Sequence, residues 1–107
     1  MLIVIDYDET YTAAPMLWNQ FIDLASSHGH TIVCCTMRPS GNDIFNEDVI
    51  TDMGQHEIQI VYAADHHDKW EAMQNAGFVP ENAIWIDDSP MYIFINRKNN
   101  EIDNEPA

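Results

Sequence analysis

The chain has 107 residues, 46% of them hydrophobic, and its 18 acidic against 4 basic side chains give a formal charge of −14 at pH 7. This length fits one domain with a modest core, and the hydrophobic content excludes a disordered chain. The charge argues against nucleic acids and anionic membranes as partners, because Lys and Arg bind such phosphate-rich surfaces, and no apolar run approaches the ~20 residues of a membrane span.

The N-terminal part of the chain predicts two buried strands with a helix between them. Residues 1–5 are a short apolar run that ends at polar residues, which is typical of a buried strand. Pro15 suits the start of a helix and Gly29 its end. The apolar face of that helix is expected to comprise Leu17, Trp18, Phe21, Leu24 and Ala25. Residues 31–36 are β-branched and apolar and predict the second strand.

The rest of the chain continues this alternation of strands and helices. The expected elements are a helix over 43–53, a strand over 58–62, a helix over 66–76 capped by Asp65, and a strand over 83–86. Residues 91–95 fit either a short strand or a helical turn. Residues 97–107 are polar and acidic, and we expect a flexible tail that follows a single catalytic domain of residues 1–96.

The order of these elements predicts an α/β fold with a mainly parallel sheet of four to five strands and helices on both faces. In such a sheet the carboxyl ends of the strands meet at one edge, where ligands bind. The polar residues expected at this edge are Asp6, Asp8, Thr36, Lys69, Asp87 and Asp88. Paired carboxylates there can hold a divalent cation, and one of them can attack phosphorus.

These residues resemble the motifs of the haloacid dehalogenase-like (HAD) hydrolase superfamily, over about residues 1–92. The motif Asp-x-Asp-x-Thr after a strand is matched by residues 6–10, and the Thr that ends the next strand by Thr36. Lys69 matches the Lys at a helix start, and residues 87–88 match the acidic pair after a later strand. Each motif alone is weak, but their order on the expected elements is specific. The resemblance implies a Rossmann-like three-layer sandwich without a cap domain, and a Mg²⁺-dependent phosphomonoester hydrolase.

The resemblance also implies roles for the carboxylates. Asp6 would be the nucleophile that forms a phospho-aspartate, because a carboxylate is already ionised at neutral pH and needs no activating base. Asp8 would act as general acid and then as general base. Mg²⁺ would be held by Asp6, the backbone carbonyl of Asp8 and Asp88, with Asp87 behind Asp88 or in its place.

The remaining motif residues would bind the phosphoryl group. Thr36 would donate a hydrogen bond to it, and Lys69 would supply positive charge. Arg38 follows Thr36 at a spacing seen in some relatives, and it would bind the substrate or hold its own loop. Glu9 departs from the family, which often has Gly after the second Asp. Substrate choice in this family depends largely on cap domains, so the substrate stays open beyond a phosphorylated small molecule.

Two other functions fit parts of the pattern. The acidic surface and small size suit a catalytically silent binding module on a HAD scaffold. A receiver-like phospho-acceptor domain has a similar size and residue set, but its acceptor Asp ends the third strand, where this chain has Ala63 and Ala64. The N-terminus lacks the basic segment of a secretion signal, so a cytoplasmic location is expected.

Overall fold

The structure, a computed structural model, describes residues 1–41 and 43–95, and the tail expected over 97–107 lies outside them. Its four strands are β1 (Leu2–Ile5), β2 (Thr31–Thr36), β3 (Gln59–Tyr62) and β4 (Ala83–Ile86). They form one sheet in the order β3-β2-β1-β4, and every adjacent pair is parallel. None of the helices in the described part of the chain has the length and apolar character needed to cross a membrane.

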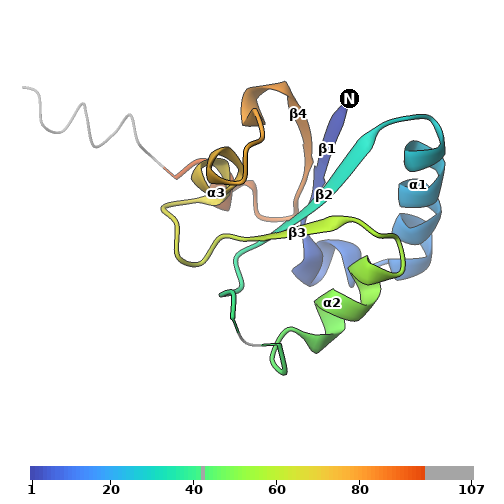
Figure 1. The fold of residues 1–107 in the computed structure, drawn as a ribbon, viewed down its shortest axis with the longest axis horizontal. Helices are drawn as coiled ribbons and strands as arrows, with labels where there is room; N and C mark the ends of the chain where they lie inside the picture. The colour runs from blue at the N-terminus through green and yellow to red at the C-terminus, as the bar shows by residue number, and fades with distance from the viewer. Residues whose placement is uncertain (42, 96–107) are drawn as a thin grey trace, which may run out of the picture.

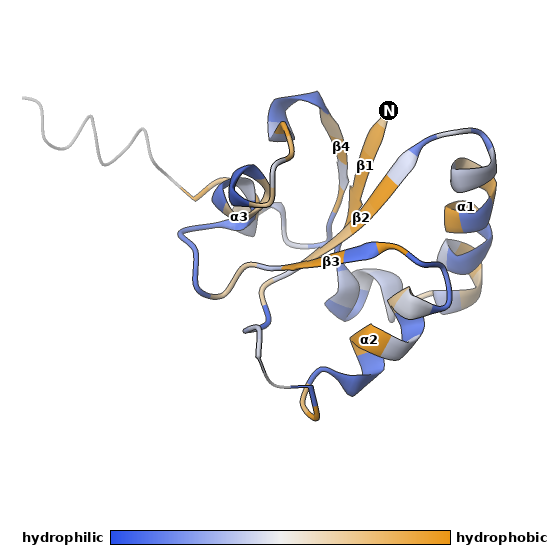
Figure 2. Ribbon diagram, viewed as in Figure 1, coloured by the Kyte–Doolittle hydropathy of each residue, from blue (hydrophilic) through white to orange (hydrophobic). Residues whose placement is uncertain are grey.

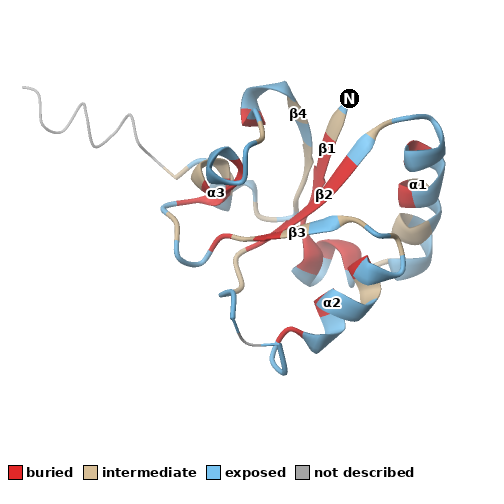
Figure 3. Cartoon of the chain, viewed as in Figure 1, coloured by how far each residue is buried: buried red, intermediate tan, exposed pale blue. Residues whose placement is uncertain are grey.

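The helices cover both faces of the sheet, which confirms the α/β three-layer architecture. The helices are α1 (Pro15–Ser27), α2 (Glu47–Gly54) and α3 (Lys69–Asn75). In Figure 1, α1 and α2 lie on one side of the sheet and α3 lies on the other. Hydrophobic residues line β1 and β2 (Figure 2), and these strands are the most buried part of the chain (Figure 3). One core cluster packs under α1 and α2, and a second under α3.

The strand order creates a crevice at one place on the sheet. From β1 the chain moves outward through β2 to β3, and β4 then pairs with the opposite side of β1. The segments that follow β1 and β4 therefore diverge, which is the arrangement that opens a ligand site in parallel sheets. The amide of Asp6 donates to the carbonyl of Ile86 at 2.9 Å, so the ladder extends one residue into this edge.

Several predicted boundaries differ from the structure. The helix expected over 66–76 begins at Lys69, because the Asp68 side chain accepts from the Glu71 amide at 2.8 Å and caps the helix where Asp65 was expected to do so. The helix expected over 43–53 begins at Glu47, and residues 43–46 form a turn. The alternative left open for residues 91–95 is decided by a short helical turn over Pro90–Tyr92.

The predicted apolar face of α1 is partly wrong. Leu17 and Leu24 are 58% and 61% exposed, whereas Ile22 is fully buried. The stripe that packs on the sheet runs through Trp18, Ile22 and Ala25, which lie one or two turns apart on the helix. The apolar residues of this helix cover more than one face, so periodicity alone does not select the face that is buried.

Candidate active site

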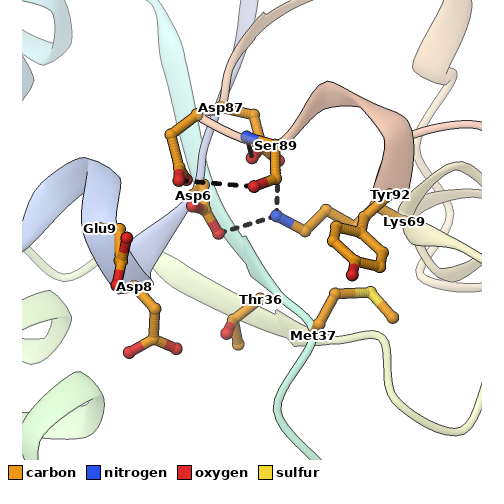
Figure 4. Close-up of a pocket in the computed structure, with 10 residues that line it drawn as sticks. Asp6, Asp8, Glu9, Thr36, Met37, Lys69, Asp87, Ser89 and Tyr92 are labelled. Atoms are coloured by element: carbon orange, nitrogen blue, oxygen red, sulfur yellow. Dashed lines mark hydrogen bonds and ion pairs between the residues drawn. The ribbon is translucent and has the colours of Figure 1, made fainter.

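A pocket of about 390 Å³ opens at the carboxyl edge of the sheet (Figure 4). Its lining comprises Asp6, Asp8, Glu9, Thr36, Met37, Lys69, Asp87, Asp88, Ser89 and Tyr92. All the side chains expected at this edge therefore line one pocket, although they come from four separate segments of the chain. Arg38 is the exception among the candidate residues, because it is not part of the described lining.

A buried lysine connects two of the carboxylates. Lys69 is 2% exposed, and its Nζ donates to Asp6 Oδ1 at 2.8 Å and to Asp87 Oδ2 at 2.6 Å. Lys69 is the first residue of α3, so the Asp68 cap fixes where the lysine enters the pocket. Figure 4 shows its side chain extending across the pocket toward Asp6. An ammonium placed between two carboxylates in a buried site is a strong, directional ion pair.

Burial and neighbouring charges shift the proton affinities of this pair. The pKa of Asp6 is raised to about 6, because burial outweighs the hydrogen bond and the charge of Lys69, which lower it. The neighbouring Asp88 and Asp87 add to the rise. Burial alone would lower the pKa of Lys69, but its hydrogen bonds to Asp6 and Asp87 outweigh burial, and its pKa is raised. The site thus holds a charged lysine and a carboxylate that lacks full charge compensation.

Thr10 links Asp6, which follows β1, with Asp88, which follows β4, and the sequence did not reveal this role. Its Oγ1 lies 2.9 Å from Asp6 Oδ2 and 3.0 Å from Asp88 Oδ1, and it accepts from the Asp88 amide at 3.0 Å. A hydroxyl has one proton, so Thr10 donates to only one of these carboxylates at a time. The motif Asp-x-Asp-x-Thr signalled this residue, but its contacts span 78 positions along the chain.

Three carboxylates of the pocket form a set suited to a divalent cation. One oxygen each of Asp6, Asp87 and Asp88 lies within 4.8 Å of the others. Both Asp87 oxygens are already engaged, by Lys69 and by the Ser89 amide, whereas the Asp88 side chain is exposed. Hard oxygen ligands with excess negative charge fit Mg²⁺. The donor set therefore fits the expected ion, and Asp88 is its most exposed member.

Thr36 and Asp8 lie on the side of the pocket away from this set. Thr36 is fully buried at the end of β2, and its Oγ1 accepts from the Arg38 amide at 3.3 Å, which leaves the hydroxyl proton available to the pocket. Figure 4 shows the Asp8 carboxylate directed away from the Asp6 carboxylate, with the space of the pocket beside both. A phosphoryl group in that space would have carboxylates on opposite sides.

Glu9 has a backbone conformation that suits glycine, with φ 65° and ψ −2°. A residue with a Cβ is disfavoured there by about 1–2 kcal/mol. We expect Glu9→Gly to raise the free energy of unfolding in urea by about 0.5–1 kcal/mol, because relief of this strain exceeds the added entropy of the unfolded chain. Glu9→Gln keeps the strain and removes the charge. Equal stabilisation by both variants would assign the effect to charge and contradict this account.

Comparisons of the chain with protein-family models, with curated proteins and with solved structures found no match. The resemblance to HAD hydrolases stays a prediction from the motifs. The functional argument therefore depends on the geometry of the pocket and the chemistry of its side chains.

Proposed function

We propose that the protein is a Mg²⁺-dependent phosphomonoester hydrolase of the HAD type that acts through a phospho-aspartate on Asp6. The observation that supports it most is the placement of Asp6. The Asp6 side chain is 9% exposed, lies 2.8 Å from a buried ammonium, and belongs to a cluster of three carboxylates at one pocket. A carboxylate surrounded in this way can attack a phosphoryl group whose charge is neutralised on the same side.

In the first step an Asp6 oxygen attacks phosphorus, and the bond between phosphorus and the leaving oxygen breaks. Asp8, on the other side of the pocket, transfers a proton to that oxygen. Lys69 and Thr36 stabilise the phosphoryl oxygens by charge and by a hydrogen bond. Mg²⁺ bound by Asp6 and Asp88 would reduce the repulsion between the carboxylate and the phosphate dianion.

In the second step a water molecule attacks the phosphorus of phospho-Asp6. The ionised Asp8 takes a proton from this water, so the same residue acts as acid and then as base. The bond between phosphorus and the Asp6 oxygen breaks, inorganic phosphate forms, and the carboxylate is regenerated. Lys69 keeps its bond to Asp87 throughout, which holds the ammonium in the site between turnovers.

The substrate is proposed to be a phosphorylated small molecule. Its leaving group would lie between the acidic side chains of Asp8 and Glu9 on one side and the side chains of Met37 and Tyr92 on the other (Figure 4). Carboxylates on one side disfavour leaving groups with further negative charge. Nucleic acid is disfavoured as a partner by the charge of −14. The cytoplasmic location stays a prediction.

Removal of the metal tests this function. We expect hydrolysis of 4-nitrophenyl phosphate in Mg²⁺, loss to background in EDTA, and recovery when Mg²⁺ is restored in excess. Glu81→Gln removes an acidic side chain at the opposite end of β4 from the pocket. It should keep full Mg²⁺-dependent activity, which controls for the loss of one negative charge elsewhere in the protein.

The same assay separates the alternatives. Hydrolysis that persists in EDTA would contradict the metal-dependent mechanism. A Mg²⁺-dependent rise in melting temperature without hydrolysis of any phosphomonoester would instead favour the acidic binding module. If Mg²⁺ produces neither a thermal shift nor hydrolysis, the proposed metal site loses its support.

A further inference from the structure

Arg38 uses its whole guanidinium group within the protein. Its Nε donates to Asp8 Oδ2 at 3.0 Å, and its Nη2 donates to Asp8 Oδ1 at 2.8 Å and to Asp48 Oδ2 at 3.0 Å. Its Nη1 donates to Asp48 Oδ1 at 2.6 Å and to the carbonyl of Phe45 at 3.4 Å. A guanidinium has five N–H donors, and these contacts use all of them. No donor is left for a phosphate in this arrangement.

Aromatic rings and burial hold the guanidinium in place. Its central carbon lies 5.1 Å from the centre of the Tyr7 ring and 5.5 Å from that of Phe45, both within the range of cation–π attraction. The Arg38 side chain is 15% exposed, whereas Asp8 and Asp48 are 51% and 53% exposed. The arginine is therefore the fixed member of this group, and the two carboxylates are attached to it.

Asp8 needs such an attachment. It lies in the turn after β1, next to the left-handed Glu9, and its carboxylate is half exposed. A short exposed side chain samples several rotamers unless a partner selects one. The two parallel bonds from Arg38 define both the position and the plane of the carboxylate. Through Asp48, which lies in α2, the same guanidinium ties this turn to the helix layer.

We propose that Arg38 is a positioning residue, which holds the Asp8 carboxylate opposite Asp6 at the place of the leaving oxygen. The inference rests on the proposed hydrolase function. As the bond from Asp6 to phosphorus forms, the electron pair of the breaking bond goes to the leaving oxygen, which takes the proton carried by one Asp8 oxygen. The ionised Asp8 that results accepts both Arg38 bonds. Arg38 touches neither phosphorus nor the leaving group. It affects the rate of phosphoryl transfer only through the position in which it holds Asp8.

The test depends on how much help the leaving group needs. 2,4-Dinitrophenolate leaves without a proton, whereas an alkoxide requires one, so only an alkyl phosphate depends on correct placement of Asp8 in the first step. We expect Arg38→Ala to lower the single-turnover rate of phosphoryl transfer from ethyl phosphate by roughly 10²-fold. The rate with 2,4-dinitrophenyl phosphate should change by less than about threefold, and the substrate concentration at half-maximal rate should be unchanged for both.

Further variants make the result decisive. Arg38→Lys keeps the charge and loses the two parallel bonds, so it should show the same selective loss, and it carries the test if Arg38→Ala does not fold. Asp8→Asn should reproduce the selectivity. An equal rate loss on both substrates would overturn the positioning role, and a raised half-maximal concentration for both would identify Arg38 as a substrate ligand. A wild-type protein inactive on both would overturn the proposed function itself, and this inference with it.

Discussion

Replacement of Asp6 by asparagine is expected to abolish hydrolysis, lowering kcat by roughly 10⁴-fold or more, while the protein stays folded. Asparagine has the size of aspartate, but its amide does not form the covalent phosphoryl intermediate. Lys69 retains its bond to Asp87, so the buried ammonium stays paired. The measurement is steady-state hydrolysis of 4-nitrophenyl phosphate in Mg²⁺, together with mass spectrometry of acid-quenched protein, in which only the wild type should carry a phosphoryl group.

Stability measurements separate this chemical loss from unfolding. Burial raises the pKa of Asp6 to about 6, so holding the ionised carboxylate at pH 7 costs the folded protein free energy relative to the unfolded chain. The wild type, in EDTA, should therefore gain stability relative to Asp6→Asn as the pH falls from 7 through 6 toward the ordinary carboxyl range, because the folded state binds this proton first. At pH 7 the variant should melt at or above the wild-type temperature. If the variant melts well below the wild type, unfolding could account for the lost activity, and the loss would no longer identify Asp6 as the nucleophile.

Much of the fold follows from local sequence. The apolar run over 83–86 ends at two acidic residues, and β4 has these bounds. The less accurate boundaries depend on single hydrogen bonds. Both Asp65 and Asp68 are suitable capping residues by type, and only the contact from the Glu71 amide to Asp68 selects the helix start. The buried face of α1 was mispredicted for a related reason, because the position of the sheet decides which apolar stripe it covers.

The pocket was more predictable than the contacts within it. Parallel topology alone brings Asp6, Thr36 and Asp87 to one edge, since each residue ends or follows a strand at that edge. The partners of Arg38 were not predictable in this way. Asp8 and Asp48 lie 30 and 10 positions from it, and periodicity carries no information about which carboxylate an arginine will contact. The same limit concealed the contacts of Thr10 across the pocket.

Lys69→Met is expected to give the largest loss of stability, about 3–5 kcal/mol in free energy of unfolding at pH 7 without metal. Methionine fills similar space and removes the ammonium that lies 2.8 Å from Asp6 and 2.6 Å from Asp87. The side chains of these carboxylates are only 9% and 3% exposed, so each would be buried without its partner. Urea denaturation in EDTA measures the loss, and it should shrink at pH 5, because burial raises the pKa of Asp6 and this carboxylate, without the ammonium, takes up a proton more readily in the folded state.

The double variant Lys69→Met/Asp87→Asn identifies the cause. If uncompensated charge destabilises the single variant, neutralising Asp87 should restore a large part of the stability, although it adds a second substitution to the site. Mg²⁺ should also stabilise Lys69→Met more than it stabilises the wild type, because the ion supplies the positive charge that the variant lacks. If the double variant is less stable than Lys69→Met, then packing around the lysine stem, and not its charge, is what the lysine contributes. The negative charge of Asp6, Asp87 and Asp88 would then not destabilise the protein when the ammonium is absent. The electrostatic argument that this cluster requires a cation, either Lys69 or Mg²⁺, would fail.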